Sequence, residues 1–221
     1  TTVTNGSDVV VNATVTNTGD LEDTQTINFS VDGANEDDQQ VTLAGGDSET
    51  VQFTYTTQGG ETEAVVSSDD DSANTSLTVN EPANFGVSIN DADSTTTVTN
   101  GSDVVVNATV TNTGDLEDTQ TINFSVDGAN EDDQQVTLAG GDSETVQFTY
   151  TTQGGETEAV VSSDDDSANT SLTVNEPANF GVSINDADST TTVTNGSDVV
   201  VNATVTNTGD LEDTQTINFS V

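Results

Sequence analysis

Apolar and polar residues alternate along most of the chain, and this two-residue period is that of β-strands. In the first such segment Val9, Val11, Ala13 and Val15 share one face, and the intervening positions are mainly polar. Further strands are predicted at Ile27–Val31, Val41–Leu43, Val51–Tyr55, Glu63–Ser67, Leu77–Val79 and Phe85–Ile89. The 3.6-residue apolar period of an amphipathic helix does not occur in the sequence. The pattern therefore predicts an all-β protein.

Turn signals separate these segments. They are Asn5-Gly6, Asn17–Asp20, Asp32-Gly33, Gly45–Asp47 and Gly59-Gly60. Glycine, asparagine and aspartate favour the tight turns that join neighbouring strands. Seven short strands separated by such turns within about 95 residues are typical of an immunoglobulin-like (Ig-like) β-sandwich.

The whole pattern is repeated. Thr1–Thr95 recurs without a substitution as Thr96–Thr190, and Thr191–Val221 repeats the first 31 residues again. A repeat of this size indicates an array of whole domains, and such arrays serve to reach, space or polymerise. Because the copies are identical, none has been specialised for a site of its own.

The only proline of each full repeat marks the linker, at Asn80-Glu81-Pro82-Ala83-Asn84 in the first copy. Proline favours an extended, fairly stiff connection here. We therefore predict an Ig-like repeat over residues 1–80 that lacks its first strand, a complete one over 84–176, and a partial one with only the first strands over 179–221. The chain is interpreted as a window of a longer array, or as fragments completed by neighbouring chains.

The net charge of the chain indicates the environment in which it folds. The chain has 40 Asp and Glu residues and no Lys, Arg or His, which gives a formal charge of −40. Such self-repulsion opposes compaction at low ionic strength, whereas at molar salt the Debye length falls to about 3 Å. We therefore expect a halophilic source. Intrinsic disorder is the alternative for an acidic chain with few aromatic residues, but the regular alternation favours a folded protein.

The same composition limits the partners. Nucleic acids and anionic membranes are excluded as direct partners, because no side chain can neutralise a phosphate. Cysteine is absent, so disulfides cannot stabilise the fold. No apolar run approaches the roughly 20 residues of a membrane-spanning helix. The expected partners are neighbouring copies of the chain itself and cations.

Several runs resemble a known family. They are Val15–Asp20, Phe29–Gly33, Leu43–Asp47 and Val51–Tyr55. These runs are similar to the CARDB class of adhesion-related Ig-like domains, which are common in surface proteins of halophilic archaea. One departure is Gly45, where related domains often have proline. The resemblance implies display outside the cell, at the cell surface, and it transfers no catalytic residue.

The residue types present in the chain offer little support for catalysis. Nucleophilic catalysis needs an activating base, and His, Lys and Cys are missing. Carboxylate pairs could act as in glycoside hydrolysis, but that requires an apolar pocket to raise one pKa, and the sequence suggests none. We therefore expect no enzyme activity, no catalytic residues and no cofactor apart from cations at the domain junctions.

Acidic residues concentrate in loops expected at the two poles of each sandwich. If domains stack head to tail, one acidic pole faces another, and Ca²⁺ or a similar cation could bridge them through carboxylate oxygens. These carboxylates are Glu36, Asp37, Asp38 and Glu61 at one pole and Asp115, Glu117, Asp118, Asp142, Asp164, Asp165 and Asp166 at the other. The simpler alternative, which we favour, is that the linkers hold the poles apart and monovalent ions screen them.

Asn-x-Ser/Thr triplets are candidate N-glycosylation sites. They occur at Asn5, Asn12, Asn28, Asn74, Asn100, Asn107, Asn123, Asn169, Asn195, Asn202 and Asn218. The triplet alone is weak in a chain rich in Asn, Ser and Thr. Strand parity adds to it, because Asn12, Asn28 and Asn74 are expected on outward faces, where a glycan would meet solvent.

These features predict a structural protein whose tandem sandwiches lie as beads on a rod, forming an extracellular filament, fibre or stalk. The array is either one continuous polypeptide or a polymer in which Phe85, Val87 and Ile89 exemplify a strand donated between subunits. Two alternatives stay open. One is a multivalent adhesin or carbohydrate-binding array, although the parity of Tyr55 predicts that this aromatic points inward. The other is a surface-layer spacer that carries a functional head elsewhere.

Overall fold

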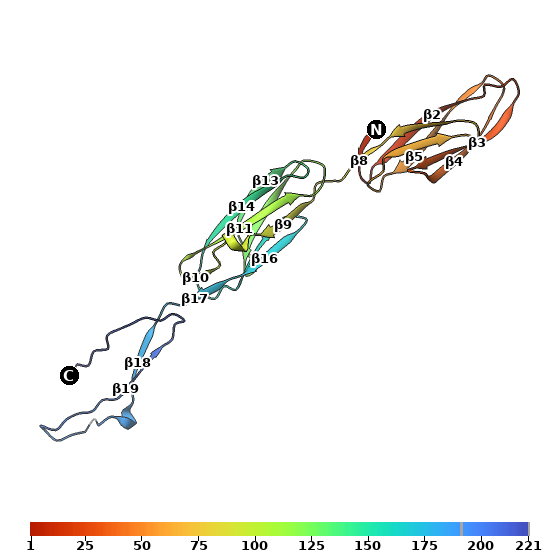
Figure 1. The fold of residues 1–221 in the computed structure, drawn as a ribbon. Helices are drawn as coiled ribbons and strands as arrows, with labels where there is room; N and C mark the ends of the chain where they lie inside the picture. Colours follow the sequence, from red (N-terminus) through yellow and green to blue (C-terminus); the bar gives the residue numbers. More distant parts are fainter. Residues whose placement is uncertain (191, 221) are drawn as a thin grey trace. The chain divides into compact units, whose positions relative to one another are not determined.

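The computed structural model describes residues 1–190 and 192–220, and it confirms the all-β prediction (Figure 1). Within these residues the only helical segments are two 3₁₀ turns, Asp91–Asp93 and Asp186–Asp188. Consequently no helix in the described part of the chain has the length and apolar character needed to cross a membrane.

The first repeat contains two sheets that face each other. Its strands are β1 (Thr2–Thr4), β2 (Asp8–Thr16), β3 (Asp23–Val31), β4 (Ala34–Leu43), β5 (Ser48–Thr56), β6 (Glu63–Ser67), β7 (Ser72–Ser76) and β8 (Thr78–Asn80). One sheet pairs β2 with β5, and the other has the order β4-β3-β6-β7. A short parallel pair, β1 with β8, brings the beginning and end of the repeat together.

Alternation explains how the core forms. The inward residues of β3 and β5 meet between the sheets, where Phe29 and Phe53 stack with ring centroids 5.2 Å apart. Val9, Ile27 and Val51 are buried beside them. The middle repeat has the same stacked pair, at 5.1 Å. The sequence therefore places its largest apolar side chains between two sheets, as in a β-sandwich.

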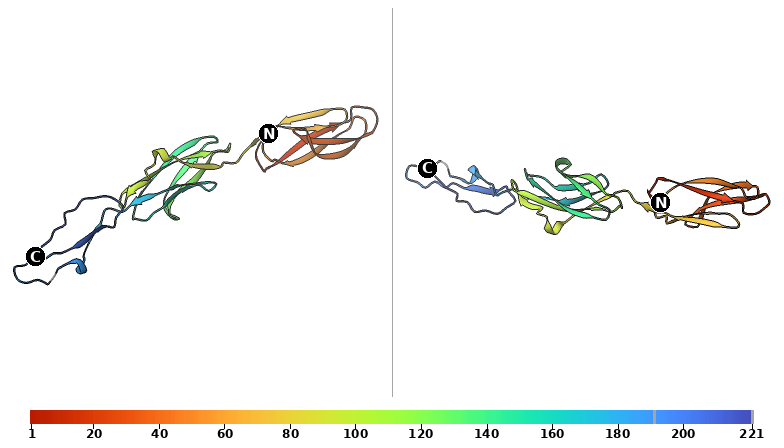
Figure 2. Two further views of the ribbon diagram at one scale, coloured as in Figure 1. Left: turned by 60° about the horizontal axis from the view of Figure 1, so that its bottom comes forward. Right: turned by 90° about the horizontal axis from the view of Figure 1, so that it is seen from above.

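The middle repeat has one strand more. Its strands are β9 (Phe85–Ile89), β10 (Thr97–Thr99), β11 (Asp103–Asn112), β12 (Asp118–Val126), β13 (Ala129–Leu138), β14 (Ser143–Thr151), β15 (Glu158–Ser162), β16 (Ser167–Ser171) and β17 (Thr173–Asn175). The strand β9 adds to the edge of the first sheet, giving the order β14-β11-β9, while the second sheet keeps the order β13-β12-β15-β16. Figures 1 and 2 show these strands lying side by side in one part of the chain.

The third, partial repeat is far less regular (Figure 2). It has β18 (Phe180–Ile184) and β19 (Ala203–Asn207), which pair with each other. The expected third strand does not form in the described residues, and Ile217 and Phe219 are exposed. In the first repeat this segment is β3, which pairs with β4 and β6. Neither partner has a counterpart among the 221 residues.

The structure corrects the prediction that Glu36, Asp37 and Asp38 lie in a loop at one pole of the sandwich. Asp32 and Gly33 have positive φ angles of 46° and 82°, as the two central residues of a tight hairpin turn require. Because the turn is so short, β4 begins at Ala34. Glu36, Asp37 and Asp38 therefore lie on an edge strand, and the register shifts beside Glu36 at a β-bulge. Acidic side chains on such an edge discourage pairing with other chains.

The chain divides into two compact units. One consists of Thr1–Asn84, Asn112–Asp118 and Thr137–Asp142, and the other of Phe85–Thr111, Thr119–Val136 and Ser143–Val221. The stacked pair Phe29 and Phe53 belongs to the first unit, and the pair Phe124 and Phe148 belongs to the second. Each unit therefore has an aromatic core of its own.

Candidate functional site

The most specific feature of the middle repeat is the groove that holds β9. The strand lies at the edge of β11 and closes the opening between the two sheets next to β16. Phe85 is completely buried, and Val87 is nearly so. The apolar residues of β11 that face the core, Val106, Ala108 and Val110, are also completely buried. The strand β9 therefore completes this core.

Side chains of the loop before β16 bind the backbone of β9. The Phe85 N–H donates to Asp165 Oδ2 at 2.8 Å, and the Val87 N–H donates to Asp166 Oδ2 at 2.9 Å. Ser163 Oγ donates to the Phe85 carbonyl at 2.6 Å. The hydrogen bond from Val87 is the largest cause of a lowered pKa at Asp166. Two carboxylates thus take the place of an adjacent strand.

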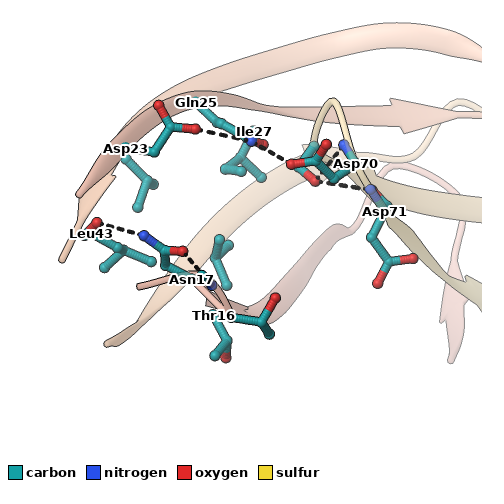
Figure 3. Close-up of a pocket in the computed structure, with 13 residues that line it drawn as sticks. Thr16, Asn17, Asp23, Gln25, Ile27, Leu43, Asp70 and Asp71 are labelled. Atoms are coloured by element: carbon teal, nitrogen blue, oxygen red, sulfur yellow. Dashed lines mark hydrogen bonds between the residues drawn. The ribbon is translucent and has the colours of Figure 1, made fainter. Parts of the chain in front are cut away.

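The first repeat has a corresponding groove, lined by residues of β2, β3 and β4 and by Asp70 and Asp71 of the loop before β7 (Figure 3). The sheet there has only two described strands, β2 and β5. Two hollows of about 350 Å³ and 130 Å³ lie along the groove. Val11, Ala13 and Val15, which correspond to the buried residues of β11, are only half-buried. Identical residues thus differ in exposure according to whether the additional strand is present.

A second specific feature is the linker. Both carboxylate oxygens of Glu81 accept from Asn5 Nδ2, at 3.2 and 3.0 Å. The Glu81 N–H donates to Asp115 Oδ2 at 2.8 Å, and the Asp115 N–H donates to the Glu81 carbonyl at 3.0 Å. The same bonds join Asn100, Glu176 and Asp210 in the next copy. One glutamate therefore contacts the residues before and after the linker.

Two further carboxylates stabilise turns. Asp32 accepts hydrogen bonds from the Thr62 hydroxyl and from the backbone N–H groups of Thr62 and Glu63, and these lower its pKa. Glu61 is buried and accepts from the N–H groups of Gln58 and Gly59, at 2.6 and 2.9 Å. The bond from Gln58 is the main cause of its lowered pKa.

The structure gives the predicted cation ligands mostly other partners. Glu61, Asp115, Asp165 and Asp166 accept backbone hydrogen bonds as described above, and Glu36–Asp38 lie on β4. Glu117, Asp142 and Asp164 are exposed, and Asp118 begins β12. Across residues 1–190 and 192–220, no three acidic side chains lie close enough together to hold a metal ion. The junction cation stays a prediction.

The candidate glycosylation sites differ in environment. Asn74 and Asn169 are exposed on β7 and β16, and Asn28 and Asn123 are half-buried. Asn107 is only 9% exposed, since its Nδ2 donates to the Asp93 carbonyl and its Oδ1 accepts from Gln147. Its copies Asn12 and Asn202 are exposed.

The remaining candidates are Asn5, Asn100, Asn195 and Asn218. In Asn5 and Asn100 the amide nitrogen that would carry the glycan binds the linker glutamate. Asn195 and Asn218 are exposed in the partial repeat. Strand parity predicts that Asn12 and its copies face outward. It does not account for the segment Asp91–Asp93, which covers Asn107 in the middle repeat.

Tyr55 packs against the core, as its parity predicts. It is half-buried, its ring centroid lies 6.5 Å from that of Phe29, and its hydroxyl donates to Glu61 at 3.0 Å. Burial is the main cause of its raised pKa. The exposed aromatic expected of a ligand-binding array is therefore not found at this position.

The model of a family described as a domain of unknown function, DUF7407, matches residues 85–173. None of the curated proteins matches the chain. Among solved structures, red sea bream transglutaminase aligns with 76% of this chain at 13% identity and a TM-score of 0.32. The chain spans 29% of that structure's length, and a likeness this distant supports no functional argument.

Proposed function

We propose that this chain is a structural repeat protein: tandem Ig-like sandwiches, similar to CARDB domains, that build an extracellular filament, fibre or stalk of a halophilic organism. The repeats act as building material and carry no enzyme activity. Length comes from repetition, either within one polypeptide or by joining subunits.

The observation that supports this proposal best is the recurrence of the linker contacts. Glu81 and Glu176 make the same hydrogen bonds in successive copies, to Asn5 and Asp115 in one case and to Asn100 and Asp210 in the other. A connection that recurs with identical residues lets a chain be extended by adding copies. A flexible tether between independent domains would not need a bound linker.

The acidic surface fits the proposed environment. A charge of −40 without any cationic side chain favours molar salt, where repulsion between the carboxylates is screened. Ca²⁺ or other cations at the junctions and glycans at the exposed sequons belong to the same proposal, because both would protect a protein displayed outside the cell.

Electron microscopy of native particles tests the proposal. A strand of 6–8 residues spans about 20–26 Å, and a sandwich with its loops should add about 40 Å of length. We expect filaments or stalks with an axial repeat near this value. Compact particles without an axial repeat would contradict a structural role, and a rod that always ends in a separate head would identify a spacer.

A further inference from the structure

We propose that the parallel pair of β10 and β17 is a mechanical clamp, which resists tension passed along the array from one linker to the next. This inference rests on the proposed structural role, because a filament or stalk under load pulls on both ends of each domain. It specifies which element of the sandwich resists the pull.

The path of the tension leads through this pair. Tension enters the middle repeat through the linker before β9 and leaves it through the linker after β17. The strand β17 pairs with β10 (Figure 1) and with no other strand in the described part of the chain. A pull on the end of β17 is therefore first taken up by its hydrogen bonds to β10.

The parallel register loads these bonds in shear. Thr97 lies opposite Thr173, and Thr99 lies opposite Asn175. The chain enters β10 at Thr97 and leaves β17 at Asn175, so a lengthwise pull acts on opposite ends of the pair. Such a pull slides one strand along the other. All the bonds between the strands must then stretch together, instead of opening one at a time.

Further hydrogen bonds close both ends of the pair. The Thr173 N–H donates to the Thr96 carbonyl, and the Asn100 N–H donates to the Asn175 carbonyl, each at 2.9 Å. Both carboxylate oxygens of Glu176 accept from Asn100 Nδ2, at 3.0 and 3.2 Å. Asn100 directly follows β10 and Glu176 directly follows β17, so the same sliding would break these charge-assisted bonds as well.

The strand β10 is itself anchored on both sides. Before it, Thr95 and Val105 of β11 exchange two backbone hydrogen bonds, at 2.7 and 3.0 Å. After it, the Gly101 N–H donates at 3.1 Å to the carbonyl of Thr152, a buried residue that follows β14. Load taken up by β10 therefore passes into the sheet that contains β11 and β14.

The first repeat contains the same clamp. Its strands β1 and β8 pair in parallel, the Asn5 N–H donates to the Asn80 carbonyl at 2.8 Å, and Asn5 Nδ2 donates to Glu81. Domains joined in series all carry the same tension, so the weakest one determines the strength of the array. Identical clamps in successive copies suit a chain that bears load.

The test is forced unfolding of single molecules of the full 221-residue chain at constant force and molar salt. The chain has no cysteine, so two introduced cysteines can carry the handles. Ala83→Cys with Ala178→Cys, at equivalent positions of successive copies, loads the middle repeat lengthwise. Ser102→Cys with Ala178→Cys pulls on neighbouring ends of β10 and β17 and opens their bonds one at a time. We expect unfolding at the same force to be about tenfold slower, or more, in the lengthwise direction.

The side-chain bond of the clamp is tested in the lengthwise direction. Glu176→Ala removes the bonds from Asn100 and should speed unfolding roughly three- to tenfold. Glu176→Gln should largely restore the rate, because an amide oxygen also accepts a hydrogen bond. The matched control is Glu158→Ala, which removes the hydrogen bond from Asn169 between β15 and β16, outside the clamp. It should change the rate of forced unfolding by less than about twofold, although denaturant unfolding should show a similar loss of stability in both alanine variants.

Two results would overturn the inference. One is an equal rate of unfolding in the two pulling directions. The other is a main unfolding step that Asp165→Ala with Asp166→Ala accelerates while Glu176→Ala does not, because β9 would then bear the tension. Native filaments with an axial repeat, together with either result, would leave the structural role intact and refute the clamp alone. Compact native particles would refute the structural role, and a direction-dependent resistance of the purified chain would still support the clamp.

Discussion

Replacing Gly114 with alanine tests whether the linker is fixed to the loop that follows β11. A Cβ atom at this position would overlap the carbonyl oxygen of Pro82 and lie 2.6 Å from its carbonyl carbon and 2.8 Å from the Cα of Ala83. These are backbone atoms, so no side-chain rotation relieves the overlap. The linker must move away from the loop.

The hydrogen bonds that this movement breaks determine how much stability is lost. The Thr113 N–H donates to the Asn84 carbonyl at 2.8 Å, and the Asn84 N–H donates to Asn112 Oδ1 at 3.1 Å. The pair between Glu81 and Asp115 adds two more bonds. Two or three lost bonds at roughly 0.5–1.5 kcal/mol each, less about 0.4–1 kcal/mol gained by replacing glycine, leave a net loss of about 1–2 kcal/mol.

The chain supplies its own control at Gly19, which has the same sequence neighbours. There a Cβ atom would meet only Asn17 Oδ1, at 3.2 Å. Gly19→Ala should therefore change stability by less than about 1 kcal/mol, with a small gain from the stiffer unfolded chain. Identical sequence with different surroundings separates the linker contact from the intrinsic effect of the substitution.

Amide hydrogen exchange measures the outcome. Only one repeat should carry the isotope label, introduced by segmental ligation, because signals of identical repeats would overlap. In Gly114→Ala the protection of the Thr113 and Asp115 amides should fall by roughly 5–30-fold. Equal effects in both variants, or no effect in Gly114→Ala, would refute the idea that the linker is bound to this loop.

Four further outcomes are expected. Phe85→Ala should destabilise the middle repeat by about 3–5 kcal/mol in thermal unfolding, because the ring of Phe85 is completely buried. Phe180→Ala should have little effect, because Phe180 is only half-buried. Equal effects of the two substitutions would contradict the role of β9 in the core. Five carboxylates have a lower pKa in the folded protein than in the unfolded chain, so their charged form stabilises the fold above about pH 4. At molar salt, where general charge repulsion is screened, the melting temperature should therefore fall as the pH drops below about 4. These carboxylates are Asp32, Asp127, Glu61, Glu156 and Asp166. The raised pKa values of Tyr55 and Tyr150 predict a loss of stability above about pH 10, and a pH-independent melting temperature would refute both assignments. Glycopeptide mapping of the native protein should find glycans in Asn-Thr-Ser peptides, because Asn74 and Asn169 are exposed on β7 and β16; Asn-Thr-Ser peptides without a glycan would contradict this.

Sequence reasoning located the strands whose alternation has a buried side. In β3 and β5 the inward residues are Phe29 and Phe53, so the two-residue period is visible without a structure. It missed β7, which has the sequence Ser-Ala-Asn-Thr-Ser and is held at the edge of β6 by backbone pairing. Most of β4 is exposed, so its run of polar residues predicts a loop and not a strand.

The groove could not be predicted in the same way. Asp165 and Asp166 lie 79–80 residues from the backbone groups that they bind, and in the sequence they belong to an ordinary acidic turn. The alternation of apolar residues did predict a strand at Phe85–Ile89. It did not indicate which side chains would bind that strand, since this depends on how the loop before β16 folds against β9.

The identical repeats separate what local sequence determines from what a neighbouring strand determines. The turn carboxylates Asp32 and Asp127 make the same hydrogen bonds in both copies, because all their partners belong to their own repeat. Val15 and Val110 differ, since only Val110 lies beside β9. Most of the sandwich is therefore specified within one repeat, and its last core contacts depend on the strand that follows the linker.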